Sequence, residues 1–257
     1  MKILFLGTGS GKVSTNRFHS SILLSVKDYN LLIDAGDGIA RSIITAGINF
    51  NSIHGILLTH LHPDHFSGLS SLLVQMKMLG RTNPLDIFIY YKLKTQVENI
   101  LLQSYIFSER LGFEIRYKTF ENDIQFVAAH NLSIIARQNS HLSHLENYKK
   151  IYPTLSFYSA SFLIRAENKK IIYTSDIGVQ EDLYLYKEII SDIFITEVTH
   201  LPVSIILEEL LQISGGKFYL THYADEDATE ISEILSSFIQ RYNLQAKLAE
   251  DRLIVEI

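Results

Sequence analysis

Six consecutive residues constrain this chain more than any other feature. The apolar run Gly55–Thr59 predicts a buried strand, and His60-Leu61-His62-Pro63-Asp64-His65 follows it directly. Four potential metal ligands in six residues would arise by chance in about one chain in a thousand of this composition. In an extended segment His60 and His62 point the same way, while Asp64 and His65 turn into a helix toward a second position about 3.5–4 Å away. The spacing therefore indicates two metal ions.

A cluster of hydrogen-bonded histidines at the start of a helix is the alternative interpretation. Burying three imidazoles and a carboxylate without partners is costly, which disfavours it. The chain has no cysteine, so a transition metal must be held by histidines and carboxylates. Imidazole and carboxylate suit zinc, and manganese or iron is also compatible with these ligand types. We therefore expect two divalent ions, with zinc as the default.

The net charge of the chain indicates which classes of binding partner are expected. Among 257 residues, 23 are Lys or Arg and 28 are Asp or Glu, giving a net charge of -5. The chain lacks the basic excess that drives sequence-independent binding of nucleic acid, although a local basic patch is compatible with it. No segment has the length of a signal-peptide core or of a membrane-spanning helix. We expect a cytoplasmic protein without a membrane partner.

Short apolar runs alternate with helical periodicity along the whole chain, which predicts an α/β fold. The predicted strands are Ile3–Leu6, Ser21–Val26, Asn30–Asp34, Gly55–Thr59, Asp86–Tyr91, Leu132–Ala136, Ser159–Arg165, Lys170–Thr174, Asp192–Thr196, Lys217–Thr221 and Arg252–Ile257. The predicted helices are Ile39–Ala46, Phe66–Leu79, Lys94–Ser108, Val203–Ile213 and Ala228–Tyr242. No linker or low-complexity tract separates them, so residues 1–257 are predicted to form a single domain.

A faint internal repeat links the two halves of the chain. One strand in each half ends near an aspartate, Asp34 or Asp176, and another ends in Thr-His, at His60 or His222. Side chains at strand ends project from the edge of a sheet. Two such halves packed face to face would gather these polar residues at one rim.

The glycine-rich segment Gly7-Thr8-Gly9-Ser10-Gly11-Lys12 suggests nucleotide binding, but it does not meet the requirements. A P-loop needs glycine in place of Leu6 and serine or threonine in place of Val13. A dinucleotide fingerprint needs glycine in place of Lys12. We interpret the segment as a tight turn after the first strand.

The motif His60 to His65 resembles the His-x-His-x-Asp-His hallmark of the metallo-β-lactamase-fold hydrolases. Three further segments look like the ribonuclease Z branch of that superfamily, and the order of motifs is kept. These segments are Phe5-Leu6-Gly7-Thr8-Gly9-Ser10, Leu32-Ile33-Asp34-Ala35-Gly36-Asp37-Gly38 and Glu197-Val198-Thr199. The resemblance implies a four-layer αββα sandwich, in which two mixed sheets pack face to face with helices outside.

The resemblance also implies a set of metal ligands. His60 and His62 would bind the first ion together with a later histidine. The spacing after the strand Leu132–Ala136 favours His141 for that position, and His144 is the alternative.

The second ion would be bound by Asp64 and His65 together with His222, and Asp176 would bridge both ions. Asp34 is similar to a residue that orients a ligand without binding the metal itself. The bridging carboxylate has a physical purpose, because two adjacent cations repel and a shared anion reduces that repulsion.

The sequence departs from the ribonuclease Z pattern in two places. Ribonuclease Z-like proteins have a histidine directly before the glutamate that matches Glu197, where Thr196 stands here, and His200 is a candidate substitute for protonating the leaving oxygen. Their long tRNA-gripping arm has no counterpart either, because the segment from Leu142 to Ser175 must already supply two strands.

These observations predict a metal-dependent phosphodiesterase in which a metal-bound hydroxide attacks phosphorus and Asp64, together with His200, handles protons. The expected substrate is a small or short phosphodiester, RNA included. A cyclic-nucleotide phosphodiesterase is an alternative, because Ser159-Ala160-Ser161-Phe162-Leu163-Ile164 and His200-Leu201-Pro202 also look like that relative. A lactone, thioester or β-lactam hydrolase and a metal-stabilised binding module are the others. Similar proteins commonly form homodimers, so a homodimer is expected as well.

Overall fold

Two seven-stranded sheets form the centre of the molecule. The structure is a computed structural model that describes all residues 1–257. The first sheet has the order β14 (Ile254–Glu256), β1 (Lys2–Gly7), β2 (Ser21–Val26), β3 (Tyr29–Ile33), β4 (Gly55–Leu57), β5 (Leu85–Tyr90) and β6 (Ile115–Phe120). The second has the order β13 (Ala246–Leu248), β12 (Gly215–Thr221), β11 (Ser191–Glu197), β10 (Lys169–Tyr173), β9 (Ala160–Ala166), β8 (Leu132–Gln138) and β7 (Gln125–Ala129).

Both sheets are mixed. Strands β3 to β6 are parallel in the first sheet and β10 to β13 are parallel in the second, whereas β1, β2 and β7 to β9 pair antiparallel. The order of the second sheet therefore mirrors that of the first. The aspartates of the faint repeat follow equivalent strands, β3 and β10, but its Thr-His ends do not, because β4 is next to β3 whereas β11 separates β12 from β10.

The inner faces of the sheets pack against each other. Ile3 and Ile33 from the first sheet line one small cavity together with Ile164 and Tyr173 from the second. Both inner faces belong to one cluster of 50 buried apolar residues, and the outer face of the second sheet has its own cluster of 16. Burial of this apolar surface is the main driving force for the sandwich.

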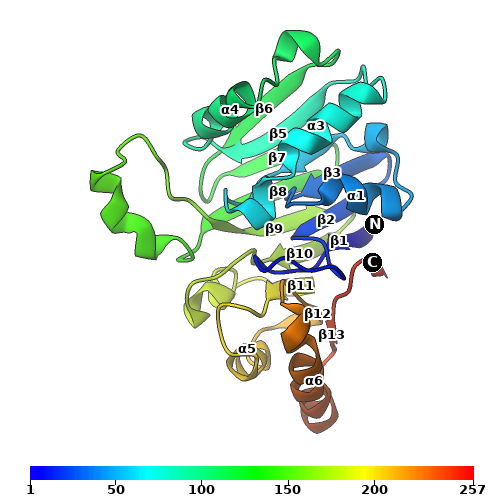
Figure 1. Cartoon of the computed structure of the whole chain (residues 1–257). Helices are drawn as coiled ribbons and strands as arrows, with labels where there is room; N and C mark the ends of the chain where they lie inside the picture. Colours follow the sequence, from blue (N-terminus) through cyan, green and yellow to red (C-terminus); the bar gives the residue numbers. More distant parts are fainter.

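Helices cover the two outer faces (Figure 1). They are α1 (Ile39–Thr45), α2 (Pro63–Phe66), α3 (Leu69–Met78), α4 (Lys94–Gln103), α5 (Val203–Leu210) and α6 (Ala228–Tyr242). Five short 3-10 helices connect elements: η1 (Phe50–Ser52), η2 (Ser108–Arg110), η3 (Ser143–Lys150), η4 (Gln180–Tyr184) and η5 (Asp225–Asp227). The predicted α/β fold, two mixed sheets face to face with helices outside, is confirmed. No helix has the length and apolar character needed to cross a membrane.

Several predicted elements differ in detail. The single helix expected over Phe66–Leu79 is two helices, because Gly68 packs so closely against Gly36 that a β-carbon there would lie 2.2 Å from the Gly36 carbonyl oxygen. The helix expected over Lys94–Ser108 ends at Gln103. Strands β6, β7 and β13 were not predicted. Between β8 and β9 the chain projects from the sandwich through η3, the green loop on the left of Figure 1.

Candidate metal centre

The predicted ligands meet at one rim of the sandwich. Parallel strands expose their carboxyl ends at the same edge of a sheet, and the site residues follow these ends. Asp34 follows β3, His60 lies three residues beyond β4, Asp176 three residues beyond β10, and His222 directly follows β12. The loop after β8 brings His141 to the same rim.

One group consists of His60, His62, His141 and Asp176. One potential ligand atom from each lies within 4.8 Å of the others. The Nδ1 atom of His62 is 3.0 Å from Nε2 of His141. Oδ2 of Asp176 is 3.9 Å from Nε2 of His60 and 3.7 Å from Nε2 of His141. Three ring nitrogens and one carboxylate oxygen thus converge, which is a suitable donor set for a four-coordinate divalent ion.

A second group consists of Asp64, His65, His222 and the same Asp176. Nε2 of His222 is 3.0 Å from Oδ2 of Asp64 and 3.3 Å from Nε2 of His65. Oδ1 of Asp176 is 3.1 Å from Nε2 of His65 and 3.5 Å from Nε2 of His222. The two oxygens of Asp176 therefore face different groups, as a bridging carboxylate requires.

The donor set suits cations better than it suits hydrogen bonds among its own members. Nε2 of His60 and Oδ1 of Asp176 are buried without a hydrogen-bond partner. Although Oδ1 lies close to His65, the geometry is not that of a hydrogen bond. Leaving such atoms unpaired is costly, and a divalent cation in each group would satisfy them.

Residues behind the ligands orient the imidazole rings. Oγ1 of Thr59 donates to Oδ2 of Asp34 (2.9 Å) and accepts from Ser175 (2.9 Å), so the remaining hydrogen bond, to Nδ1 of His60 (3.0 Å), must be donated by the imidazole. Nδ1 of His65 donates to Oδ2 of Asp34 at 2.8 Å. In both rings the proton is then on Nδ1, and the Nε2 lone pair faces the site.

Burial and charge set the protonation of this cluster. Burial lowers the pKa of His60 well below its ordinary value and lowers the pKa of His141 to about 4. Burial would raise the pKa of Asp64, but the hydrogen bond from His222 and the charge of His65 hold it at about 2. Burial alone would lower the pKa of His65. The negative charges of Asp176 and Asp34 outweigh this effect, so the pKa of His65 is raised well above its ordinary value. A cation at Nε2 of His65 would take the place of that proton.

The structure separates the two candidates for the third histidine. His141 belongs to the first group, whereas Nδ1 of His144 donates to the carbonyl of His141 at 3.0 Å and lies outside it. All seven predicted ligands are brought together at the rim. That they bind metal remains a prediction.

Two buried residues that the sequence analysis missed hold the His141 and Asp176 loops together. The amide of Asn139 donates to the carbonyl of Asp176 at 2.8 Å and accepts from the His141 N–H at 3.3 Å. Oδ2 of Asp182 accepts from the Ser140 hydroxyl (2.7 Å) and from the Gly178 N–H (2.9 Å). Neither residue has a motif in the sequence that would have indicated this role.

Next to the metal ligands lies a carboxylate–histidine pair, Glu197 and His200. Oε1 of Glu197 accepts from Nδ1 of His200 at 2.8 Å, and Oε2 accepts from the N–H groups of Thr199 (2.6 Å) and His200 (3.0 Å). The hydrogen bond that His200 donates to Glu197 raises the pKa of His200. The sequence analysis selected His200 but gave Glu197 no role of its own.

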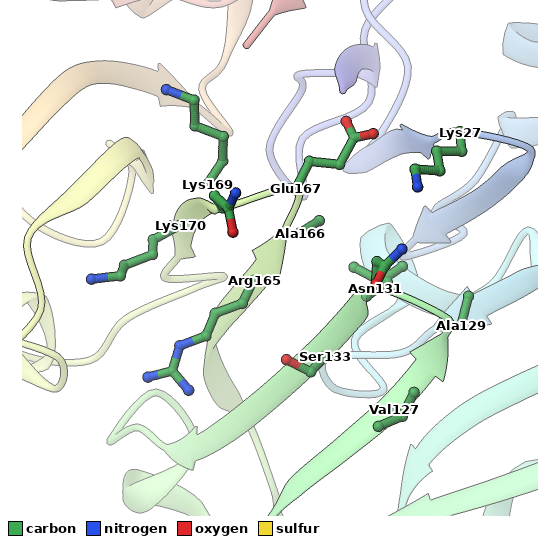
Figure 2. Close-up of a pocket in the computed structure, with 12 residues that line it drawn as sticks. Lys27, Val127, Ala129, Asn131, Ser133, Arg165, Ala166, Glu167, Lys169 and Lys170 are labelled. Atoms are coloured by element: carbon green, nitrogen blue, oxygen red, sulfur yellow. The ribbon is translucent and has the colours of Figure 1, made fainter.

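A pocket of about 420 Å³ gives access to the site. His62, Asp64, Asp176, His200 and His222 line it together with residues of two surface segments. A larger hollow, of about 770 Å³, lies at the other end of the sheets, where β9 ends and β10 begins. Figure 2 shows that its cations Lys27, Arg165 and Lys170 do not converge on a common point. It has none of the metal-ligand chemistry of the rim.

Fold and site together define a metallo-β-lactamase-fold protein with two groups of potential metal ligands that share Asp176. The sequence profile of the family described as "Anti-Pycsar protein Apyc1" matches residues 1–244, and the chain belongs to this family. The Anti-Pycsar protein Apyc1 of Bacillus phage BSP38 is 27% identical over 237 residues, which cover 87% of this chain and 89% of the phage protein.

Ribonuclease Z proteins are also similar, over a shorter stretch. That of Methanococcus aeolicus is 39% identical over 105 residues, 41% of this chain and 33% of the relative, so the match spans only about a third of that protein. Solved structures share the fold. The metallo-β-lactamase-fold protein YhfI from Bacillus subtilis has a TM-score of 0.76 at 17% identity, covering 100% of this chain and 98% of that one. Human tRNase Z, short form, has a TM-score of 0.73 at 20% identity, covering 100% and 99%.

Proposed function

We propose that this protein is a metal-dependent phosphodiesterase acting on a small phosphodiester. One observation carries the proposal: two ligand groups share Asp176, and both contribute side chains to the pocket that His200, the partner of Glu197, also lines. A phosphodiester needs stabilisation of charge on its oxygens and a proton for its leaving group, and this pocket has residues suited to both.

We propose that the pocket holds two divalent ions, with zinc as the default. His60, His62 and His141 would hold one ion, Asp64, His65 and His222 the other, and Asp176 would contact both. Bound cations would polarise the phosphoryl oxygens and lower the pKa of a water molecule. Since every ligand is nitrogen or carboxylate oxygen, manganese and iron also suit the donor set.

The remaining chemistry falls to Asp64 and His200. Asp64 lines the pocket, and we assign it as acceptor of the proton from the attacking water. His200 donates Nδ1–H to Glu197, so its other ring nitrogen is the one available to protonate the leaving oxygen. Glu197 is 1% exposed and accepts backbone hydrogen bonds as well, which fixes the orientation of the imidazole.

The substrate class has two candidates within this chemistry. The ribonuclease Z of Methanococcus aeolicus matches 41% of this chain and that of Limosilactobacillus reuteri 55%, whereas the Anti-Pycsar Apyc1 family matches residues 1–244. This difference favours a small substrate such as a cyclic nucleotide over a long structured RNA. The net charge of -5 favours the same choice.

Metal analysis combined with a substrate panel tests the proposal. We expect about two metal ions per chain, chelator-sensitive hydrolysis of bis(4-nitrophenyl) phosphate, and loss of both metal and turnover in Asp176→Ala. Cyclic nucleotides, short RNA, acyl-homoserine lactones and thioesters then discriminate among the enzymatic alternatives. One firmly bound ion without hydrolysis of any of them would instead favour a metal-stabilised binding module.

We also propose that residues 1–257 form a single domain and that the protein is a homodimer. Limited proteolysis should find no stable fragment of either half, because each sheet contributes one face of the same apolar cluster. Light scattering would give the oligomeric state.

A further inference from the structure

The loop after β1 forms one wall of the metal pocket. Ser10, Gly11 and Lys12 line the pocket on one side, and Glu226 and Asp227 of η5 line it on another. This is the glycine-rich segment that meets the requirements of neither nucleotide-binding motif. Its place in the fold gives it a different role.

Both ends of this loop are fixed to the body of the protein. Asp251 accepts from the N–H groups of Thr8 and Phe18, both at 2.8 Å. The guanidinium of Arg17 pairs with Asp225 at 3.0 Å and lies 4.2 Å from the ring centroid of Tyr223. Because the loop is held at its two ends, the position of its tip at the pocket is determined by the fold.

The tip packs against a metal-ligand carboxylate. A β-carbon on Gly11 would lie 3.3 Å from Oδ2 of Asp64, which is a tight contact. A glycine at this position lets the backbone approach Asp64 closely. Lys12, the next residue, is thereby positioned where the pocket meets solvent.

Lys12 is the only lysine or arginine that lines this pocket. Four carboxylates line it as well: Asp64, Asp176, Glu226 and Asp227. The ammonium of Lys12 pairs with Glu226, and the two side chains are 64% and 54% exposed. Exposed ion pairs contribute little to stability, so the ammonium can exchange Glu226 for another anion at small cost.

We propose that Lys12 is a specificity-determining residue that binds a non-bridging oxygen of an anionic substrate, and that Glu226 retains the ammonium at the pocket mouth until the substrate arrives. This assignment rests on the proposed phosphodiesterase function. A lysine ammonium is a compact, mobile charge on a flexible stem, which suits transfer between two anionic partners. Attraction to the phosphodiester charge acts on binding more than on the chemical step.

The experiment compares four variants of the zinc-loaded full chain: Lys12→Ala, Lys12→Arg, Glu226→Gln and Lys27→Ala. Lys27 is an exposed lysine at the opposite end of the sheets and serves as the matched control. Steady-state kinetics use bis(4-nitrophenyl) phosphate at two salt concentrations. Calorimetric titration with inorganic phosphate measures anion binding independently of turnover, and metal content and thermal stability are measured for each variant.

We expect Lys12→Ala to raise KM about fivefold, the effect of one charge pair at ~4 Å in water, with kcat and metal content unchanged. Phosphate affinity should fall by a similar factor, Lys12→Arg should restore most of it, and Glu226→Gln should tighten it. The salt dependence of KM should weaken in Lys12→Ala. Equal phosphate affinity and KM in Lys12→Ala and Lys27→Ala would overturn the assignment. If no variant hydrolyses the diester, the proposed function fails, and the phosphate titration alone still decides the role of Lys12.

Discussion

Asp34 gives the sharpest test of how the second metal position is built. Its side chain is fully buried and accepts three hydrogen bonds: from the Thr59 N–H (2.9 Å), the Thr59 hydroxyl (2.9 Å) and Nδ1 of His65 (2.8 Å). It touches no other predicted ligand. Its effect on the metal therefore passes through the tautomer of His65.

Asp34→Asn changes one atom and leaves the backbone undisturbed. Asp34 has φ of 61°, in the left-handed region that asparagine adopts more readily than other residues with a β-carbon. If the new amide NH₂ faces His65, it meets an N–H donor, and the imidazole must move its proton to Nε2. If the amide is flipped, the NH₂ meets the backbone N–H of Thr59. Either orientation leaves a buried donor unsatisfied or removes the lone pair that His65 needs for a metal.

The magnitude follows from this geometry. Loss of a ligand-orienting partner costs about 10- to 100-fold in metal affinity. Where the amide is flipped, or where His65 keeps its proton on Nδ1, an unsatisfied buried donor costs about 1–3 kcal/mol of folding free energy. We expect the larger loss of affinity for the ion held by His65, because Asp34 bonds that imidazole directly and reaches His60 of the first group only through the Thr59 hydroxyl.

Competition with a chromogenic chelator measures the two affinities separately, and thermal unfolding of the metal-free chain gives the stability change. Asp37→Asn, at an exposed aspartate three residues further on, is the control. Two unchanged metal affinities in Asp34→Asn would refute the argument that Asp34 sets the tautomer of His65. Equal weakening of both ions would show that it acts on the whole cluster instead.

Three further predictions concern the other side of the site. His141→Ala should lose about one metal ion per chain, whereas His144→Ala should retain both by elemental analysis, and the opposite result would transfer the ligand role to His144. His200→Ala should keep its metal but lose about 10²- to 10⁴-fold in kcat on a substrate with an alkoxide leaving group. The loss should be much smaller with 4-nitrophenolate, because this leaving group needs no protonation. An equal loss with both leaving groups would argue against proton donation by His200. Asp182→Ala removes the hydrogen-bond acceptor that connects the His141 and Asp176 loops. It should therefore lower the melting temperature and weaken metal retention during dialysis. Unchanged metal retention would limit Asp182 to a structural role.

The sequence predicted the centre of each sheet better than its edges. The second halves of β3 and β10, Leu31–Ile33 and Ile171–Tyr173, are apolar runs buried on both faces, and this pattern predicts a central strand. Strand β6 alternates between half-buried and exposed residues at the edge of the first sheet, and its Arg116 and Lys118 obscure the apolar period. Strand β13 has only three residues, so periodicity could not reveal it.

The residues that meet at the rim could be selected from the sequence because histidine and aspartate are metal-ligand types wherever they lie; that they are ligands stays a prediction. Asn139 and Asp182 could not be selected in this way, because each acts only through backbone groups that the fold brings near. The break between α2 and α3 could not be predicted from the sequence either, because it also depends on residues that only the fold brings together. It depends on the approach of Gly68 to Gly36, 32 residues earlier along the chain.

Backbone strain at the rim connects the fold to the site. Asp34, Ser175 and His222 all have positive φ, of 61°, 53° and 59°, and each lies within two residues of the end of a central strand. A non-glycine residue in this region costs about 1–3 kcal/mol, and it persists only where the surroundings hold it. Here the hydrogen bonds of Thr59 join Asp34 to Ser175 across the two sheets. These bonds hold two of the three strained turns against each other, so the gap in which Asp176 faces both ligand groups is set by the packing of the sheets and not by the metal ions alone.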